Sequence, residues 1–134
     1  MSFRYGYKPK SKYGAEKTTV NGISFASKKE ARRYQELLLL QRAGKIAGLD
    51  LQVKYEIISE HREPDIVGPR GGRKKGKIIE PARYYVADFV YYDSQTAELV
   101  VEDVKGYRGG QAYALFKIKK ALMLDRYGII VKEV

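Results

Sequence analysis

Residues 85–107 read YVADFVYYDSQTAELVVEDVKGY, two runs of strand-forming residues joined by a short polar segment. Val, Tyr and Phe favour strands and the polar segment favours a turn, so we expect a hairpin over about 82–92 and 97–105. The same hairpin carries charged residues where a buried sheet has apolar ones, namely Asp88, Glu102, Asp103 and Lys105. It therefore indicates both the centre of the fold and a candidate chemical site.

Strand alternation assigns these charges to faces of the sheet. Side chains point alternately to the two faces of a strand, so Asp88 shares its row with Tyr84, Val86, Val90 and Tyr92. On the second strand Asp103 and Lys105 share one face, and Glu102 points to the other. The hairpin then brings Asp88 and Asp103 to the same end of adjacent strands. Two such carboxylates repel each other unless a cation lies between them.

The elements around the hairpin follow from periodicity. Ser27 and Glu30 form a capping-box pattern, which predicts a helix that ends near Gly44. Period-two alternation over 49–57 predicts a half-buried strand, and a second helix is expected over about 111–127 before a last strand. The order α-β-β-β-α-β predicts an α/β domain with a mixed central β-sheet flanked by helices.

Two segments lack a regular pattern. Residues 1–22 mix basic and aromatic residues without periodicity, which predicts a flexible arm before a domain over 23–134. Residues 60–81 form a long connection in which Pro64, Pro69 and the pair Gly71-Gly72 are expected to break any regular element. Loops of this length inside a domain are usually functional or disordered.

The charge of the chain points to a polyanionic partner. The 134 residues hold 26 Lys and Arg against 16 Asp and Glu, a net charge of +10, although a solvated surface would explain it more simply. The basic residues expected to bind nucleic acid lie in the connection (Arg70, Arg73, Lys74, Lys75 and Lys77), in the arm (Lys8, Lys10 and Lys12) and on the last helix (Lys117 and Lys120).

Composition also excludes several kinds of site. The chain has no cysteine and one histidine, so thiolate zinc sites, cysteine nucleophiles and sites with several histidines are excluded. The apolar runs are too short to span a bilayer, so no membrane partner is expected. A metal between Asp88 and Asp103 would have oxygen ligands, which select Mg²⁺ or Mn²⁺.

Lys105 lies beside this expected metal position. It could position or deprotonate an attacking water, or stabilise charge on a phosphate. The alternative is that Asp103 and Lys105 form an ordinary ion pair at a strand end and that Asp88 lies near a sheet edge. The residues alone leave both interpretations open.

The segments A-D-F and V-E-D-V-K-G resemble the signature of the PD-(D/E)xK nucleases, with Asp88 as the first acid and Asp103-Val104-Lys105 as the D-x-K element. The chain looks especially like a phage family of small proteins of unknown function in that superfamily. It is more distantly similar to phage endonuclease I-type Holliday junction resolvases. The resemblance covers roughly residues 22–134, and Ala87 replaces the usual proline.

The resemblance implies a restriction-endonuclease-like fold and a set of site residues. Asp88, Asp103, the Val104 carbonyl and an acid on the first helix would hold the metal, and Lys105 would act at the water. Glu30 is the expected helix acid and Glu36 the reserve; Glu30 could instead serve only the capping box. Glu102 is not chosen, because its spacing from Lys105 puts the two on opposite faces.

The resemblance also implies an activity. We expect a Mg²⁺-dependent endodeoxyribonuclease, acting as a homodimer on branched DNA such as a Holliday junction. The expected location is the cytoplasm, or the host cell cytoplasm if the protein is phage-encoded. The alternatives are a nicking or restriction-type nuclease on duplex DNA and a DNA-binding protein without catalysis.

Overall fold

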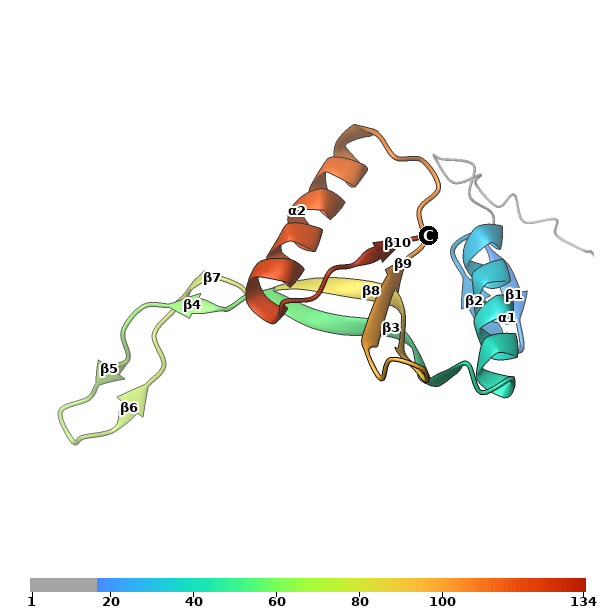
Figure 1. The fold of residues 1–134 in the computed structure, drawn as a ribbon. Coiled ribbons are helices and arrows are strands. Elements are labelled where there is room, and N and C mark those ends of the chain that lie inside the picture. The colour runs from blue at the N-terminus through green and yellow to red at the C-terminus, as the bar shows by residue number, and fades with distance from the viewer. Residues whose placement is uncertain (1–16) are drawn as a thin grey trace, which may run out of the picture.

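The computed structural model describes residues 17–134, which form a mixed α/β domain (Figure 1). Its main elements follow the predicted order α-β-β-β-α-β, which is confirmed. They are helix α1 (Lys28–Arg42), strands β3 (Ile46–Ile58), β8 (Arg83–Asp93) and β9 (Leu99–Asp103), helix α2 (Gly110–Tyr127) and strand β10 (Lys132–Glu133). The four strands form one sheet in the order β10-β9-β8-β3, in which only the β9–β10 pair is parallel.

The predicted hairpin is the centre of this sheet. Strand β8 lies between β9 and β3, and its register places Phe89 opposite Glu102 and Val90 opposite Val101. Continued by one residue, this register sets Asp88 beside Asp103, as expected from the sequence. Asp88 is therefore in the interior of the sheet, so the alternative that placed it near a sheet edge is wrong.

Single residues account for both ends of α1 and for the uncapped start of α2. The Ser27 hydroxyl caps α1 by accepting a hydrogen bond from the Glu30 backbone N–H at 3.2 Å, which confirms the expected start. Gly44, just past the end of α1, has a φ of 73°, which favours glycine. At α2 the N-cap residue is Gly109, so no side chain caps its first N–H groups.

The buried apolar residues form two clusters on the sheet. The first packs α1 against β8 and contains Phe25, Ala31, Tyr34, Leu37, Ile46, Phe89, Tyr91 and Val104. The second packs α2 and contains Ile57, Tyr85, Ala87, Val90, Val101, Phe116, Met123 and Val131. Asp88 lies where β8 passes from one cluster to the other.

The apolar row predicted around Asp88 is only partly buried. Val90 is buried, but Tyr84, Val86 and Tyr92 are 40%, 44% and 52% exposed. The opposite row of β8, from Tyr85 to Tyr91, makes the core. Both rows consist of strand-forming apolar residues, so alternation alone could not indicate which one is covered.

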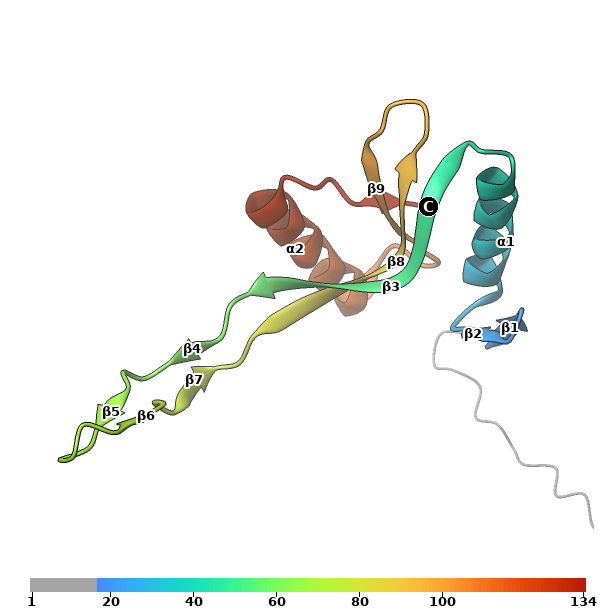
Figure 2. The same cartoon turned by 90° about the horizontal axis from the view of Figure 1, so that it is seen from below.

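Residues 60–81 were expected to lack regular structure, and this prediction is wrong. They form a two-stranded ribbon that continues β3 and β8 away from the domain (Figures 1 and 2). In it β4 (His61–Arg62) pairs with β7 (Ile78–Glu80), and β5 (Ile66–Val67) pairs with β6 (Arg73–Lys74). Pro69 and Gly71 form the turn at the tip, where Gly71 has a φ of 81° and its N–H donates to the Gly68 carbonyl at 3.0 Å.

The N-terminal boundary also differs from the prediction. Strands β1 (Thr18–Val20) and β2 (Ile23–Phe25) form an antiparallel hairpin, turned by Asn21 and Gly22 with positive φ. The folded part therefore begins before residue 23, and residues 17–22 are not a flexible arm. The rest of the expected arm, with Lys8, Lys10 and Lys12, lies outside the described residues. Within 17–134, no helix is long and apolar enough to cross a membrane.

Candidate active site

The two strand carboxylates are held by hydrogen bonds from both neighbouring strands. Asp88 accepts from the Gln52 side-chain amide of β3 at 3.2 Å and from the Val104 backbone N–H, just after β9, at 2.7 Å. Asp103 accepts from the Tyr85 hydroxyl at 2.7 Å, and its other oxygen lies 2.8 Å from Lys105 Nζ. The hairpin register thus sets the two carboxylates side by side, Asp103 at the end of β9 and Asp88 in the middle of β8.

Gln52 reaches Asp88 through an uncommon backbone conformation. Its φ of 52° lies in the left-handed region, which a residue other than glycine rarely adopts in the middle of a strand. Such conformations cost free energy and tend to occur at functional sites. From the sequence alone Gln52 could reach the site, but a polar residue on the exposed row of a strand more often has a plain surface role.

Glu30 joins the carboxylates from the first turn of α1. Its pKa is raised from 4.5 to about 7, mainly by burial and then by the nearby charges of Asp88 and Asp103, against a lowering by hydrogen bonds from Ala26 and Ser27. Glu30 therefore takes part in the cap of α1 through its backbone N–H, and its carboxylate lies near Asp88 and Asp103; its expected role as a metal ligand stays a prediction. The reserve candidate Glu36 lies elsewhere, 2.9 Å from the Arg33 guanidinium.

The pKa of Asp88 is raised as well. Burial is the largest cause, and Asp103 adds to it, while the hydrogen bonds from Val104 and Gln52 act in the opposite direction. Burial and the charge of Asp103 also raise the pKa of the Tyr85 hydroxyl, which keeps it protonated and donating to Asp103. We refer to Glu30, Asp88 and Asp103 as the acidic cluster, in which Asp88 and Asp103 raise the pKa of Glu30 and Asp103 raises that of Asp88.

Lys105 is the cation of the site. Besides its ion pair with Asp103, its Nζ lies 3.5 Å from the centroid of the Phe116 ring on α2, and its backbone carbonyl accepts a hydrogen bond from Lys29 Nζ. The lysine is thus held in one position by an acid and a ring. This is also the ion pair on which the interpretation without catalysis depends.

A pocket of about 460 Å³ opens beside these residues, between the N-terminal ends of the two helices. Its lining includes Glu30, Lys105, Lys29 and the first residues of α2, Gly110 and Gln111. The uncapped N–H groups of α2 and the positive end of its dipole favour an anion there. The pocket therefore combines an acid, two lysines and a helix end suited to a phosphate.

Glu102 lies on the other face, as predicted. It is completely buried and bound by the Arg33 guanidinium, at 2.9 Å and 2.6 Å, and by the Tyr91 hydroxyl at 2.5 Å. Sequence reasoning did not single out Arg33, although a glutamate in a buried row requires a cation. Arg33 follows Glu30 by one turn, so this contact fixes the face of α1 that presents Glu30.

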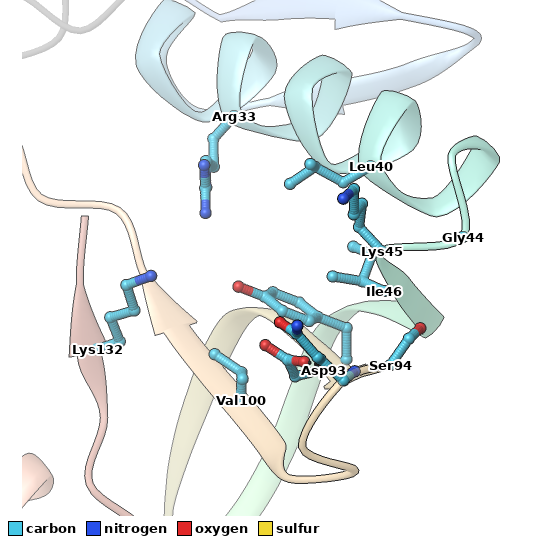
Figure 3. Close-up of a pocket in the computed structure, with 11 residues that line it drawn as sticks. Arg33, Leu40, Gly44, Lys45, Ile46, Asp93, Ser94, Val100 and Lys132 are labelled. Carbon is cyan, nitrogen blue, oxygen red and sulfur yellow. Dashed lines mark hydrogen bonds between the residues drawn. The ribbon is translucent and has the colours of Figure 1, made fainter.

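Another pocket, of about 610 Å³, lies on the face of Glu102. Arg33 points into it, with Lys45 and Lys132 at its sides (Figure 3), and Tyr91 is part of its lining. None of the predicted catalytic residues lines it. Of these residues, Glu30 and Lys105 line the pocket of about 460 Å³, whereas Asp88 and Asp103 line neither pocket.

The predicted nucleic-acid-binding residues fall into separate places. The five predicted residues of segment 60–81 are exposed in the distal part of the ribbon; they are Arg70, Arg73, Lys74, Lys75 and Lys77. Lys120 is paired with Glu133 at 2.8 Å, and together with Lys117 it lines a third pocket, of about 280 Å³, that contains neither Glu30 nor Lys105. The structure therefore does not bring these two lysines into the pocket beside the acidic cluster.

No group of three or more His, Cys, Asp or Glu side chains within 17–134 is already arranged to hold a metal ion. The donors of the acidic cluster nevertheless fit Mg²⁺ or Mn²⁺ in kind, because all are carboxylate oxygens. Burial, and to a smaller extent neighbouring negative charge, raises the pKa of Glu30 and of Asp88, and a divalent cation beside them would favour their charged forms.

The chain was compared with protein families, curated proteins and solved structures. Neither a curated protein nor a solved structure matches it. One family model, described as a protein of unknown function (DUF1064), matches residues 10–132, which is nearly the whole chain. The chain belongs to this family.

Proposed function

We propose that this protein is a Mg²⁺- or Mn²⁺-dependent endonuclease that hydrolyses phosphodiester bonds in DNA. The observation that carries the proposal is the acidic cluster beside Lys105, next to a pocket suited to a phosphate. A net charge of +10 supports a nucleic acid as the substrate. The α-β-β-β-α-β order agrees with a restriction-endonuclease-like fold, which is part of the proposal.

Each residue of the site has a role in this chemistry. Asp88, Asp103 and Glu30 would hold the metal, and the Val104 carbonyl would assist. A divalent cation in such a site supplies an activated water and offsets the charge of the reacting phosphate. Lys105 Nζ holds or deprotonates the attacking water, and the first N–H groups of α2 bind a phosphate oxygen.

The kind of DNA that the protein cuts is proposed from the sequence resemblance. Phage resolvases of the endonuclease I type suggest branched DNA, and symmetric incision of a junction suggests a homodimer. A nicking or restriction-type nuclease on duplex DNA uses the same site residues and is separated from a resolvase only by its substrate.

The test is cleavage of labelled four-way junction, flap, nicked and linear DNA, with Mg²⁺ and with EDTA. We expect the wild type to cut the junction only with the metal, and Lys105→Ala to lose cutting while it still binds. Lys54→Ala, an exposed lysine of β3, is the matched control and should cut normally. Absence of metal-dependent cleavage on every substrate contradicts the proposal. Equal cutting of linear duplex contradicts the junction preference.

One observation favours a second candidate, a DNA-binding protein without catalysis. In such a protein Asp103 and Lys105 would serve as a structural ion pair, and their charged atoms lie 2.8 Å apart. It predicts that Asp88→Asn leaves every function of the protein intact. A nuclease with this substitution would lose cutting and retain binding.

A further inference from the structure

The ribbon of residues 60–81 has an uneven distribution of charge. Its four acids, Glu60, Glu63, Asp65 and Glu80, lie toward the domain, whereas the distal part, 66–77, holds five basic residues and no acid. Two of the acids are neutralised nearby, because Glu60 pairs with Arg62 and Glu80 with Arg83. None of the five distal cations takes part in a salt bridge within the described residues. The tip of the ribbon therefore carries a concentrated positive charge.

The same part of the ribbon exposes aliphatic side chains. Ile66 is 61% and Val67 62% exposed. Pairing places each of them across from a cation: Ile66 opposite Lys74, and Val67 opposite Arg73. Cross-strand partners share a face, so both faces of the ribbon carry one aliphatic residue and one cation side by side.

The dimensions of the ribbon suit a groove of duplex DNA. The nine residues from Glu60 to Gly68 reach roughly 30 Å when extended, at about 3.3 Å for each residue. A two-stranded ribbon fits the major groove, which is about 12 Å wide, but not the minor groove of about 6 Å. Within the major groove one face of the ribbon would turn its aliphatic residue to the base edges, while the longer cations reach the phosphates on the groove walls.

We propose that the distal ribbon inserts into the major groove of duplex DNA next to the cleaved strand, with the aliphatic residue of one face, Ile66 or Val67, against the bases and Arg73 and Lys74 on the phosphates. This inference takes DNA as the partner from the proposed function and adds to it the element and the groove that hold the duplex. It needs no catalysis, so it is tested in EDTA.

The first experiment measures binding of an A·T-rich duplex against salt, in EDTA, by fluorescence anisotropy. Ile66→Ser/Val67→Ser should weaken binding at least tenfold without changing the salt dependence. Arg73→Gln/Lys74→Gln should weaken it and reduce the slope of log K against log salt by about 1.8, because two phosphates are then left without a cation. Lys54→Ala, outside the ribbon, should leave both quantities unchanged. Wild-type affinity in both double variants overturns the inference.

The second experiment identifies the groove. Replacement of thymine by uracil removes a methyl group from the major groove and leaves the minor groove unchanged. The wild type should bind the uracil duplex about fourfold more weakly for each thymine methyl group that the ribbon covers. Ile66→Ser/Val67→Ser should bind the two duplexes equally. Equal binding of both duplexes by the wild type overturns the assignment to the major groove.

Two further outcomes separate this inference from the proposed function. If the wild type binds through the ribbon but never cuts DNA with Mg²⁺, the inference stands and the nuclease fails. If it cuts DNA but the ribbon variants bind normally, the nuclease stands and the inference fails. If a sedimentation measurement shows that the double variants convert a dimer to a monomer at unchanged DNA affinity, the ribbon binds a second copy of the chain, which also overturns the inference.

Discussion

Glu30→Gln should make the protein more stable at pH 8 and leave its stability almost unchanged near pH 4.5. The pKa of Glu30 is about 7 in the folded protein and 4.5 as a free side chain, mainly because burial and then Asp88 disfavour its charge. Between these values the folded state holds a proton that the unfolded state has lost. The stability that Glu30 contributes is therefore present below pH 4.5 and is lost as the pH rises through 7.

The size of this effect follows from the two pKa values. At about 1.4 kcal/mol for each pKa unit, a rise from 4.5 to about 7 has an upper limit of about 3 kcal/mol. Glu30 is partly exposed, so water screens the repulsion and we expect about 1–2 kcal/mol. The assay is urea unfolding of the wild type and Glu30→Gln from pH 4.5 to 8, without divalent metal.

The matched control is Glu36→Gln, which removes an acid from the same helix outside the acidic cluster. It should gain no stability at pH 8, because its carboxylate pairs with Arg33 at 2.9 Å. If Glu30→Gln is no more stable than the wild type at pH 8, or if the difference between them does not vary with pH, the claim that Glu30 faces the other carboxylates is refuted.

Three further changes test other parts of the structure. Glu102→Gln should cost about 1.5–3 kcal/mol of unfolding free energy, because it removes the charge of the buried acid that Arg33 binds and leaves Arg33 paired with the exposed Glu36; a loss below about 1 kcal/mol in urea unfolding would contradict this. Gln52→Gly removes a donor that lowers the pKa of Asp88, so a carbon-13 NMR titration should find that pKa higher, not unchanged. Gly76→Ala puts a methyl 1.9 Å from the Glu63 carbonyl oxygen, so amide NMR signals should shift in the ribbon but not in the helices.

The sheet and the faces of its charges could be predicted from the sequence. A strand has a period of two, so the relation among Asp88, Asp103 and Lys105 depended only on where the hairpin turns, and the segment 93–96 determined that. The capping box of α1 was equally local, because Ser27 and Glu30 interact within a single turn. Local rules of this kind fixed most of the candidate site.

The ribbon could not be predicted by the same rules. Pro69 and Gly71 are usually taken as breakers of regular structure, and here they form the turn that makes pairing possible. Strands of two residues also give no periodic signal. The ribbon forms because it continues the long pairing of β3 with β8, and that pairing depends on the tertiary structure.

The contact between Arg33 and Glu102 could not be predicted because its two partners are 69 residues apart. Alternation placed Glu102 on the correct face, but helical periodicity offered several basic residues of α1 as partners. The sequence also did not determine which side chains of β8 are buried. Both of its rows of side chains are apolar, and the two helices pack on different parts of the strand.

The most direct test of the central claim, that the acidic cluster holds a divalent metal, is a titration with Mn²⁺ in which the EPR signal of free Mn²⁺ reports binding. We expect the wild type to bind Mn²⁺, Mg²⁺ to compete for it, and Asp88→Asn and Asp103→Asn to bind at least tenfold more weakly. Glu36→Gln should bind as the wild type does. Equal Mn²⁺ binding by the wild type and both Asn variants would contradict the claim.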